Sequence, residues 1–141
     1  MNTTMSTPGA LWLSMVTLVR DTHMDHGAVE RLLDMPFSRF RALRRLERHA
    51  RTQRELAGLM GVDGSAMSGI VSDLVERGLA TREPSEVDRR CNQVTITSAG
   101  RAVLDRVRDS DTLAPDWFDA LDANQRAALA SILDTLMGAQ G

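Results

Sequence analysis

Two helices joined by a tight turn are predicted by the stretch TQRELAGLMGVDGSAMSGIVSDLVERGL, residues 52–79, and this pair of helices sets the fold class. Thr52 with Glu55 three residues later is typical of a capping box, in which each side chain accepts a hydrogen bond from the other residue's free backbone N–H. Gly61 predicts the end of the first helix, and Asp63 predicts the N-cap of the second. A short helix, a turn and a longer helix form the helix-turn-helix pattern.

The second helix is expected over residues 64–77. Its apolar residues recur at helical spacing, and Gly78 predicts its end. We expect its core-facing side to consist of Ala66, Ile70, Val71 and Leu74.

A two-stranded hairpin is expected directly after the helix-turn-helix, in the stretch REPSEVDRRCNQVTIT, residues 82–97. Pro84 opens a polar, turn-prone segment. Val94 and Ile96 then alternate with threonines, which is the period of a half-buried strand. A hairpin in this position is a wing.

Helices are also expected on both sides of this module. Thr7 and Pro8 predict a helix start with an apolar face, and MPFSRFRALRRLERHA, residues 35–50, predicts a helix whose apolar stripe includes Phe37 and Phe40. Shorter signals predict a helical piece in VERLLD, a helix capped by Thr97, and a final helix that starts at Asp122 with Gln125 completing a capping box.

The composition fits one soluble domain. The chain has 141 residues, of which 43% are hydrophobic and 26% charged, and a single cysteine, Cys91. No apolar run approaches the roughly 18–20 residues that span a bilayer, and the N-terminus lacks a signal-peptide pattern. We therefore expect a cytoplasmic protein that does not bind membranes.

The net charge of −2 hides an asymmetry. Residues 36–101 contain twelve arginines against eight acidic residues, whereas the rest contains five against eleven. A basic centre between acidic ends indicates a polyanion-binding module carried on arms with another role, although a solvated charged face explains the same counts equally well.

The order of these elements, together with DRR at residues 88–90 and TITSAG at residues 95–100, resembles the MarR family of winged-helix transcription regulators over about residues 36–102. The resemblance implies a mainly α fold with a small two-stranded β-wing, in which dimerisation helices flank the winged helix-turn-helix. We expect an N-terminal dimerisation region at 1–34, a DNA-binding module at 35–100 and C-terminal dimerisation helices at 101–141, forming one compact domain overall.

The family resemblance further implies a homodimer that binds a pseudo-palindromic operator in double-stranded DNA. Each recognition helix would enter a major groove and each wing the adjacent minor groove, and a small aromatic or lipophilic effector would release a repressor of this kind. Arg90 matches the family's minor-groove arginine, and Asp88 matches the residue that shapes the wing and holds its guanidinium. A narrow minor groove attracts an inserted arginine through its enhanced negative potential.

Eight residues are expected to contact DNA. Gly64, Gly69 and Asp73 stand where family members often carry basic residues, so more of the attraction to phosphate falls on Arg51, Arg54 and the wing. Arg54 lies at a helix N-terminus, where phosphates bind. The expected DNA contacts are Arg54, Ser65, Met67, Ser68, Arg77, Arg82, Arg89 and Arg90.

Two groups of residues bear on small-molecule binding, one for an effector and one for a metal ion. Trp12, Met15, Phe37 and Phe40 are expected to line an effector pocket, as the family resemblance implies. His23 and His26 are three residues apart and would share a helical face, but they lack further ligands, so we expect no metal and no cofactor.

Three alternatives remain. Cys91 follows Arg89 and Arg90, and cationic neighbours are typical of reactive thiols, so the chain could be a redox sensor, although an unreactive strand cysteine is the favoured interpretation. The weakly basic recognition helix also fits a winged-helix protein-interaction module that binds no specific DNA. An enzyme is not expected, because no phosphate loop, zinc spacing or nucleophile–base arrangement is evident.

Overall fold

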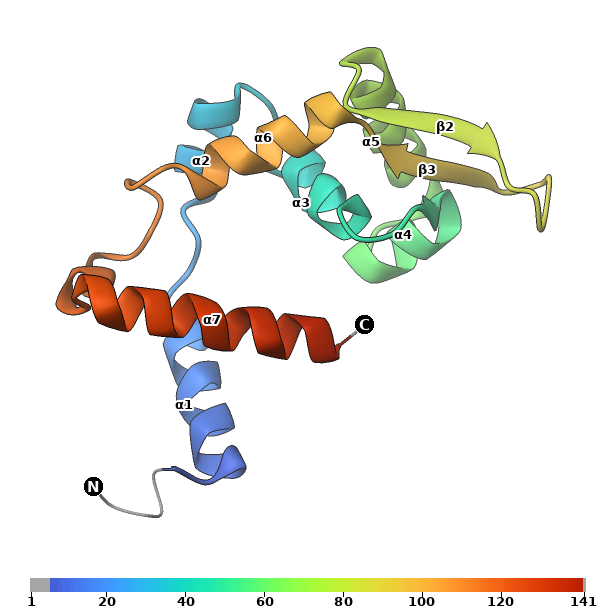
Figure 1. Cartoon of the computed structure of the whole chain (residues 1–141). Helices are drawn as coiled ribbons and strands as arrows, with labels where there is room; N and C mark the ends of the chain where they lie inside the picture. The colour runs from blue at the N-terminus through green and yellow to red at the C-terminus, as the bar shows by residue number, and fades with distance from the viewer. Residues whose placement is uncertain (1–5, 141) are drawn as a thin grey trace. The chain divides into compact units, whose positions relative to one another are not determined.

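The five N-cap residues predicted from the sequence each form a side-chain cap in the computed structural model, which describes residues 6–140, whereas the helix that starts after Pro36 has none. Thr7, Thr52, Asp63, Thr97 and Asp122 each accept a hydrogen bond from the backbone N–H three residues later. The elements are α1 (Pro8–Arg20), α2 (His26–Leu33), α3 (Phe37–Leu46), β1 (Arg51–Thr52), α4 (Gln53–Met60), α5 (Gly64–Glu76), β2 (Ala80–Pro84), β3 (Asn92–Ile96), α6 (Ser98–Arg108), η2 (Asp116–Ala120) and α7 (Ala123–Ala139) (Figure 1).

The two glycine stops are confirmed as well. Gly61 has a φ of 65° after α4, and Gly78 has a φ of 74° after α5. Glycine adopts this left-handed backbone without the steric cost of a Cβ atom. The capping box at α7 forms as predicted, whereas at α4 the Glu55 carboxylate accepts from the Thr52 hydroxyl, with 3.1 Å between the oxygens.

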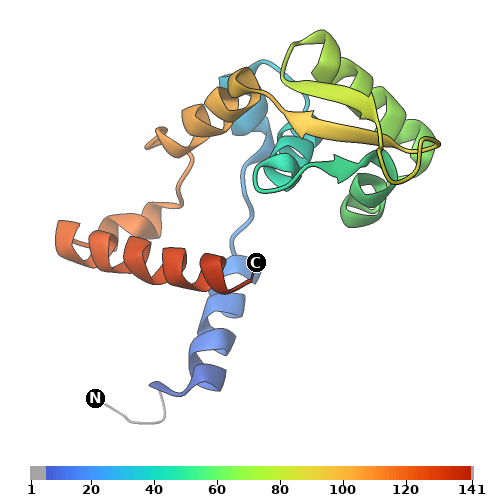
Figure 2. The same cartoon turned by 45° about the vertical axis from the view of Figure 1, so that its right-hand side comes forward.

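The mainly helical fold with a β-wing is confirmed, and the sheet has one more strand than predicted. β3 lies between β1 and β2, and both pairings are antiparallel. Ala80 pairs with Ile96 in the hairpin, while Arg51 of the two-residue β1 pairs with Val94. Figure 2 shows this short strand beside β3. It ties the start of α4 to the wing.

The hydrophobic core lies in a compact unit that spans Asp25–Leu113. Both α2 and α6 pack on α3, so this unit extends beyond the predicted 35–100 module at both ends. Its largest fully buried side chains come from α2, α3, α4, α5 and β3: Val29, Leu43, Leu46, Leu56, Met67, Val71, Leu74 and Val94.

The core-facing side of α5 differs from the prediction by one residue. Ile70, Val71 and Leu74 are buried as expected, but Ala66 is exposed and Met67 is fully buried. Met67 therefore belongs to the core, and the expectation that it contacts DNA is wrong for this structure because its side chain has no accessible surface.

The second compact unit combines the residues up to Met24 with those from Ala114 onward. Its helices α1 and α7 contain no buried residue among those described. Trp117 stacks on Phe118 with 4.7 Å between ring centroids and donates from Nε1 to Thr22 Oγ1 at 3.2 Å. None of the described helices is long and apolar enough to span a membrane.

Candidate nucleic-acid interface

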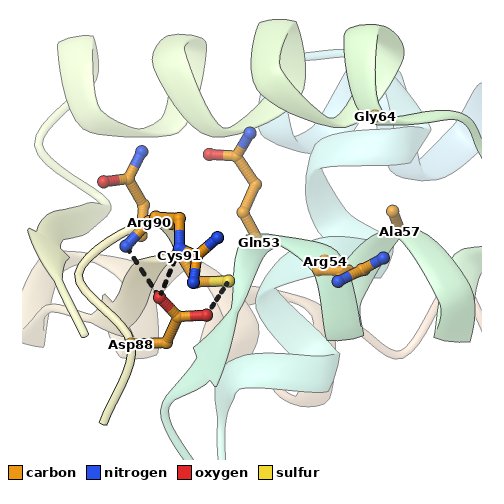
Figure 3. Close-up of a pocket in the computed structure, with 8 residues that line it drawn as sticks. Gln53, Arg54, Ala57, Gly64, Asp88, Arg90 and Cys91 are labelled. Atoms are coloured by element: carbon orange, nitrogen blue, oxygen red, sulfur yellow. Dashed lines mark hydrogen bonds and ion pairs between the residues drawn. The ribbon is translucent and has the colours of Figure 1, made fainter. Parts of the chain in front are cut away.

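A concavity of about 630 Å³ separates the wing from the starts of α4 and α5 (Figure 3). The side chains that line it include two arginines, from α4 and from the wing, and the only cysteine of the chain. The lining residues are Gln53, Arg54, Ala57, Gly64, Asp88, Arg90, Cys91 and Asn92. Elements far apart in the sequence thus present cationic and polar groups to one hollow.

The wing tip is organised by Asp88. Its carboxylate Oδ1 accepts from the Arg90 backbone N–H at 3.0 Å and lies 3.6 Å from Arg90 Nε, and its backbone carbonyl accepts from the Cys91 N–H at 2.9 Å. The Ser85 hydroxyl accepts from the backbone N–H of Asp88 at 3.4 Å. These bonds close the turn and orient the Arg90 side chain (Figure 3).

The Arg90 guanidinium is presented to solvent, since 93% of the side chain is exposed. An exposed ion pair of this kind adds only about 0–1 kcal/mol to stability. The contact with Asp88 therefore matters for the direction of the arginine more than for the stability of the fold. Arg89, also exposed, lies at the same tip and lines a separate shallow hollow with Pro84 and Glu86.

The N-terminus of α4 offers a second group of donors. Arg54 is exposed in its first turn, where free backbone N–H groups and the helix dipole favour a phosphate. Gln53 beside it has a buried Oε1 atom without a hydrogen-bond partner among the described residues. Ser65 of α5 is exposed and Ser68 is half-buried, one turn further along the helix.

Arg82 lies against α5, the helix expected to enter the major groove as the recognition helix. Its Nη2 donates to Ser72 Oγ at 2.8 Å and to the Ser68 carbonyl at 3.3 Å. These contacts hold β2 to α5, and they engage the guanidinium group of an arginine that was expected to contact DNA. No sequence signal indicated this pairing, because the partners are ten or more residues apart in different elements.

Arg77 is also engaged within the protein. It follows α5 at its C-terminal end, where its Nε donates to Asp73 Oδ2 at 3.1 Å and its Nη1 donates to the Asp34 carbonyl at 3.2 Å. Asp34 itself ends α2 with a φ of 51°. The arginine therefore links the end of α5 to the turn after α2.

Asp73 is the centre of this network, a role that sequence reasoning missed. Its Oδ2 also accepts from Arg39 Nε at 2.9 Å. The hydrogen bond from Arg39 is the largest cause that holds the pKa of the Asp73 carboxyl below its usual value. Burial acts in the opposite direction, and the hydrogen bond from Arg77 lowers the pKa further. The negative charge of Asp73, which looked unfavourable for DNA binding, is thus balanced by two arginines. The sequence signal for one of these pairs was the spacing of Asp73 and Arg77, which are four residues apart on a helix.

The residues expected to form an effector pocket are divided between the two compact units. Trp12 and Met15 belong to α1, where both are exposed, whereas Phe40 is buried in the central unit and Phe37 is half-buried there. Phe37 stacks on His26 with 3.7 Å between ring centroids. A pocket shared by all four side chains stays a prediction.

The histidine pair and the cysteine have ordinary surroundings. His23 lies in a non-helical segment before α2, so the expectation that it shares a helical face with His26 is wrong. Within residues 6–140 no cluster of three or more histidine, cysteine, aspartate or glutamate side chains could hold a metal ion. Cys91 lies in the turn just before β3, with Sγ 3.9 Å from Asp88 Oδ2.

Comparison with known proteins agrees with this architecture. A sequence model of the MarR family matches residues 33–90. The chain is 31% identical over 124 residues to the uncharacterized HTH-type transcriptional regulator YpoP of Bacillus subtilis, and this match covers 85% of the chain and 86% of YpoP.

Solved structures share the fold over nearly the whole chain. A MepR mutant from a multidrug-resistant S. aureus clinical isolate has a TM-score of 0.71 at 15% identity, covering 96% of this chain and 99% of that one. YusO of Bacillus subtilis has a TM-score of 0.62 at 20% identity, covering 93% and 94%. Apo MarR from E. coli has a TM-score of 0.55 at 23% identity, covering 92% and 96%. With its helix-turn-helix, its wing and these relatives, the chain belongs to the MarR family of winged-helix transcriptional regulators.

Proposed function

We propose that the chain is a homodimeric repressor that binds a pseudo-palindromic operator and releases it when a small effector binds. The observation that carries the DNA-binding part is the wing tip, where Asp88 orients an almost fully exposed Arg90. An arginine held in this way can enter a narrow minor groove without first ordering its own side chain.

The other proposed contacts with DNA come from side chains of α4, α5 and the wing that are at least partly exposed to solvent. Ser65 and Ser68 lie at the N-terminal end of α5 and would meet base edges or phosphates in the major groove. Arg54 would bind a backbone phosphate together with the N-terminus of α4, and Arg89 would bind one beside the wing. Arg82 and Arg77 act indirectly, because they hold the recognition helix in place.

Dimer formation is supported by the apolar side chains that the terminal helices leave uncovered. Leu11, Trp12 and Leu18 of α1 are 50–65% exposed, and Ile132 and Leu136 of α7 are 56% and 45% exposed. Exposed apolar surface of this extent marks an interaction site. A two-fold dimer would place two recognition helices about 34–36 Å apart, one turn of DNA.

The effector would be a small aromatic or lipophilic molecule in a pocket that includes Trp12, Met15, Phe37 and Phe40, and the protein would act in the cytoplasm.

A second candidate function is redox sensing. Cys91 lines the same concavity as Arg54 and Arg90, so an oxidised sulfur would add bulk and charge where DNA is expected. Hydrogen peroxide that lowers the DNA affinity of the parent, but not of Cys91→Ser, would establish that candidate.

The test is an electrophoretic mobility shift of the purified full chain with a duplex from upstream of its own gene. We expect unlabelled specific duplex to compete while a scrambled duplex of the same composition does not, and we expect the affinity to fall steeply between about 50 and about 200 mM salt. Equal competition by the scrambled duplex would contradict specific repression and favour the protein-interaction alternative.

A further inference from the structure

A strongly basic segment of the chain begins in helix α3 and continues into α4. Residues 39–54 contain seven arginines and a single acidic residue, Glu47. Three of these arginines, Arg41, Arg44 and Arg45, form what is here termed the α3 stripe. We propose that the α3 stripe is a binding site for a compact multivalent oxyanion, of the class presented by the phosphate groups of a small molecule.

The three side chains share one face of the helix. Their spacing of three and four residues brings them onto adjacent turns, and all three are exposed. Together they line a concavity of about 220 Å³. This volume lies below the roughly 300–1,000 Å³ of pockets for drug-sized ligands, so the hollow suits only a compact ligand.

The positive charge of the α3 stripe is not balanced within the part of the chain that the structure describes. No carboxylate there forms an ion pair with Arg41, Arg44 or Arg45. The only acid of α3's own C-terminal end, Glu47, instead accepts from Arg108 Nη2 with both carboxylate oxygens, at 2.6 Å for Oε2. Three like charges on adjacent turns repel one another, and a bound anion would remove that repulsion.

Two of the guanidinium groups are held in place by neighbouring groups. Arg41 Nη2 lies 3.5 Å from the Met60 carbonyl at the end of α4, and the Arg44 guanidinium lies over the Phe40 ring, 5.8 Å from its centroid. Each guanidinium has five N–H donors, so these contacts orient the groups and leave most donors for a ligand. The planar fork of arginine matches the oxygens of a phosphate two at a time.

The chemistry of the lining favours a phosphate over an aromatic acid. Only arginine side chains line the hollow, so it lacks the apolar wall that an aromatic acid requires. None of its lining residues takes part in the concavity between the wing and the starts of α4 and α5. The α3 stripe is therefore a site separate from the candidate DNA interface, and this inference does not depend on DNA binding.

The experiment is isothermal titration of the full chain with inorganic pyrophosphate, at an ionic strength held constant with sodium chloride. We expect saturable binding with one pyrophosphate per chain. Arg44→Gln and Arg45→Gln should each weaken binding about tenfold, the ratio expected when one charge-assisted hydrogen-bonding partner is lost. Arg101→Gln, an exposed arginine on α6, is the matched control and should bind like the parent.

Three results would overturn the proposal. The first is a titration of the parent without saturable binding. The second is equal binding by Arg45→Gln and the Arg101→Gln control. The third is that the parent binds no pyrophosphate while Arg44→Gln loses DNA affinity, with a salt dependence of DNA binding that is flatter by about one phosphate contact. This result would assign the α3 stripe to the DNA footprint. Unchanged unfolding midpoints of both variants in chloride would show that the fold is intact.

Discussion

The two compact units of the chain differ in how they use their apolar residues. The central unit, Asp25–Leu113, buries all of the large apolar side chains that are hidden in the described structure, whereas α1 and α7 bury none and expose Leu13, Val19 and Met137, among others. The central unit has the core of an independent fold. The terminal helices have the composition of a core without its burial, which is what helices show when their partner is another chain.

The first prediction tests the tightness of the central packing and has the largest expected effect. At Gly100, at the start of α6, an added Cβ would lie 2.7 Å from Ile96 Cγ1 and closer still to the Leu79 carbonyl oxygen. Because both contacts are shorter than real Cβ atoms make and one is to a backbone atom, Gly100→Ala should lower the free energy of unfolding by about 2–4 kcal/mol, measured by urea unfolding.

The matched control lies in the other unit. A Cβ added at Gly138 of α7 would meet no atom within 4 Å. Gly138→Ala should therefore leave stability unchanged or raise it by up to about 1 kcal/mol through helix propensity. Similar losses in both variants would show that the two units are packed alike and would contradict the comparison.

The second prediction concerns the uncovered helices. Leu136→Glu should weaken dimer formation at least about tenfold, because a dimer interface would have to desolvate the introduced carboxylate, while the central unit stays folded. Sedimentation velocity measures the association state, and far-ultraviolet circular dichroism measures the fold. Asn124→Glu, a polar and exposed position of the same helix, should leave the dimer intact. A Leu136→Glu protein that associates like the parent would show that α7 does not form the interface.

The third prediction examines the ion-pair network of the central unit. The pKa of Asp73 is lowered in the folded state, so its contribution to stability is present above the unfolded pKa of about 4 and is lost as the pH falls through the folded value. Asp73→Asn should cost about 0.5–1 kcal/mol at pH 7 and should reduce the acid-induced loss of stability below about pH 4. An unchanged slope of stability against pH would show that Asp73 does not contribute.

The features that could be predicted from the sequence depend on nearby residues. The caps at Thr7, Asp63 and Asp122 each bond a backbone group three residues away, so a short window of sequence contains the whole interaction. The same holds for the wing turn, where Asp88 and Arg90 are two residues apart. The family resemblance rested on these local patterns.

The features that were missed depend on distant partners. The strand at Arg51 exists because β3 lies beside it, some forty residues later in the chain. Met67 is buried because α5 packs against other helices with a rotation that its own periodicity does not determine. Arg82 pairs with Ser72, and Asp73 pairs with Arg39, across different elements, and no spacing within one element reveals these two pairs.

The role of the wing in DNA binding is tested by fluorescence anisotropy of a labelled operator duplex, with the Arg90→Ala variant compared with Arg89→Ala. The two arginines are neighbours and both are exposed, but Asp88 orients only Arg90 in the described contacts. Arg90→Ala should weaken binding about ten- to a hundredfold, and Arg89→Ala by only a few fold. If Arg90→Ala bound the duplex as tightly as the parent does, the wing would not be a DNA-binding element and the proposed function would be wrong.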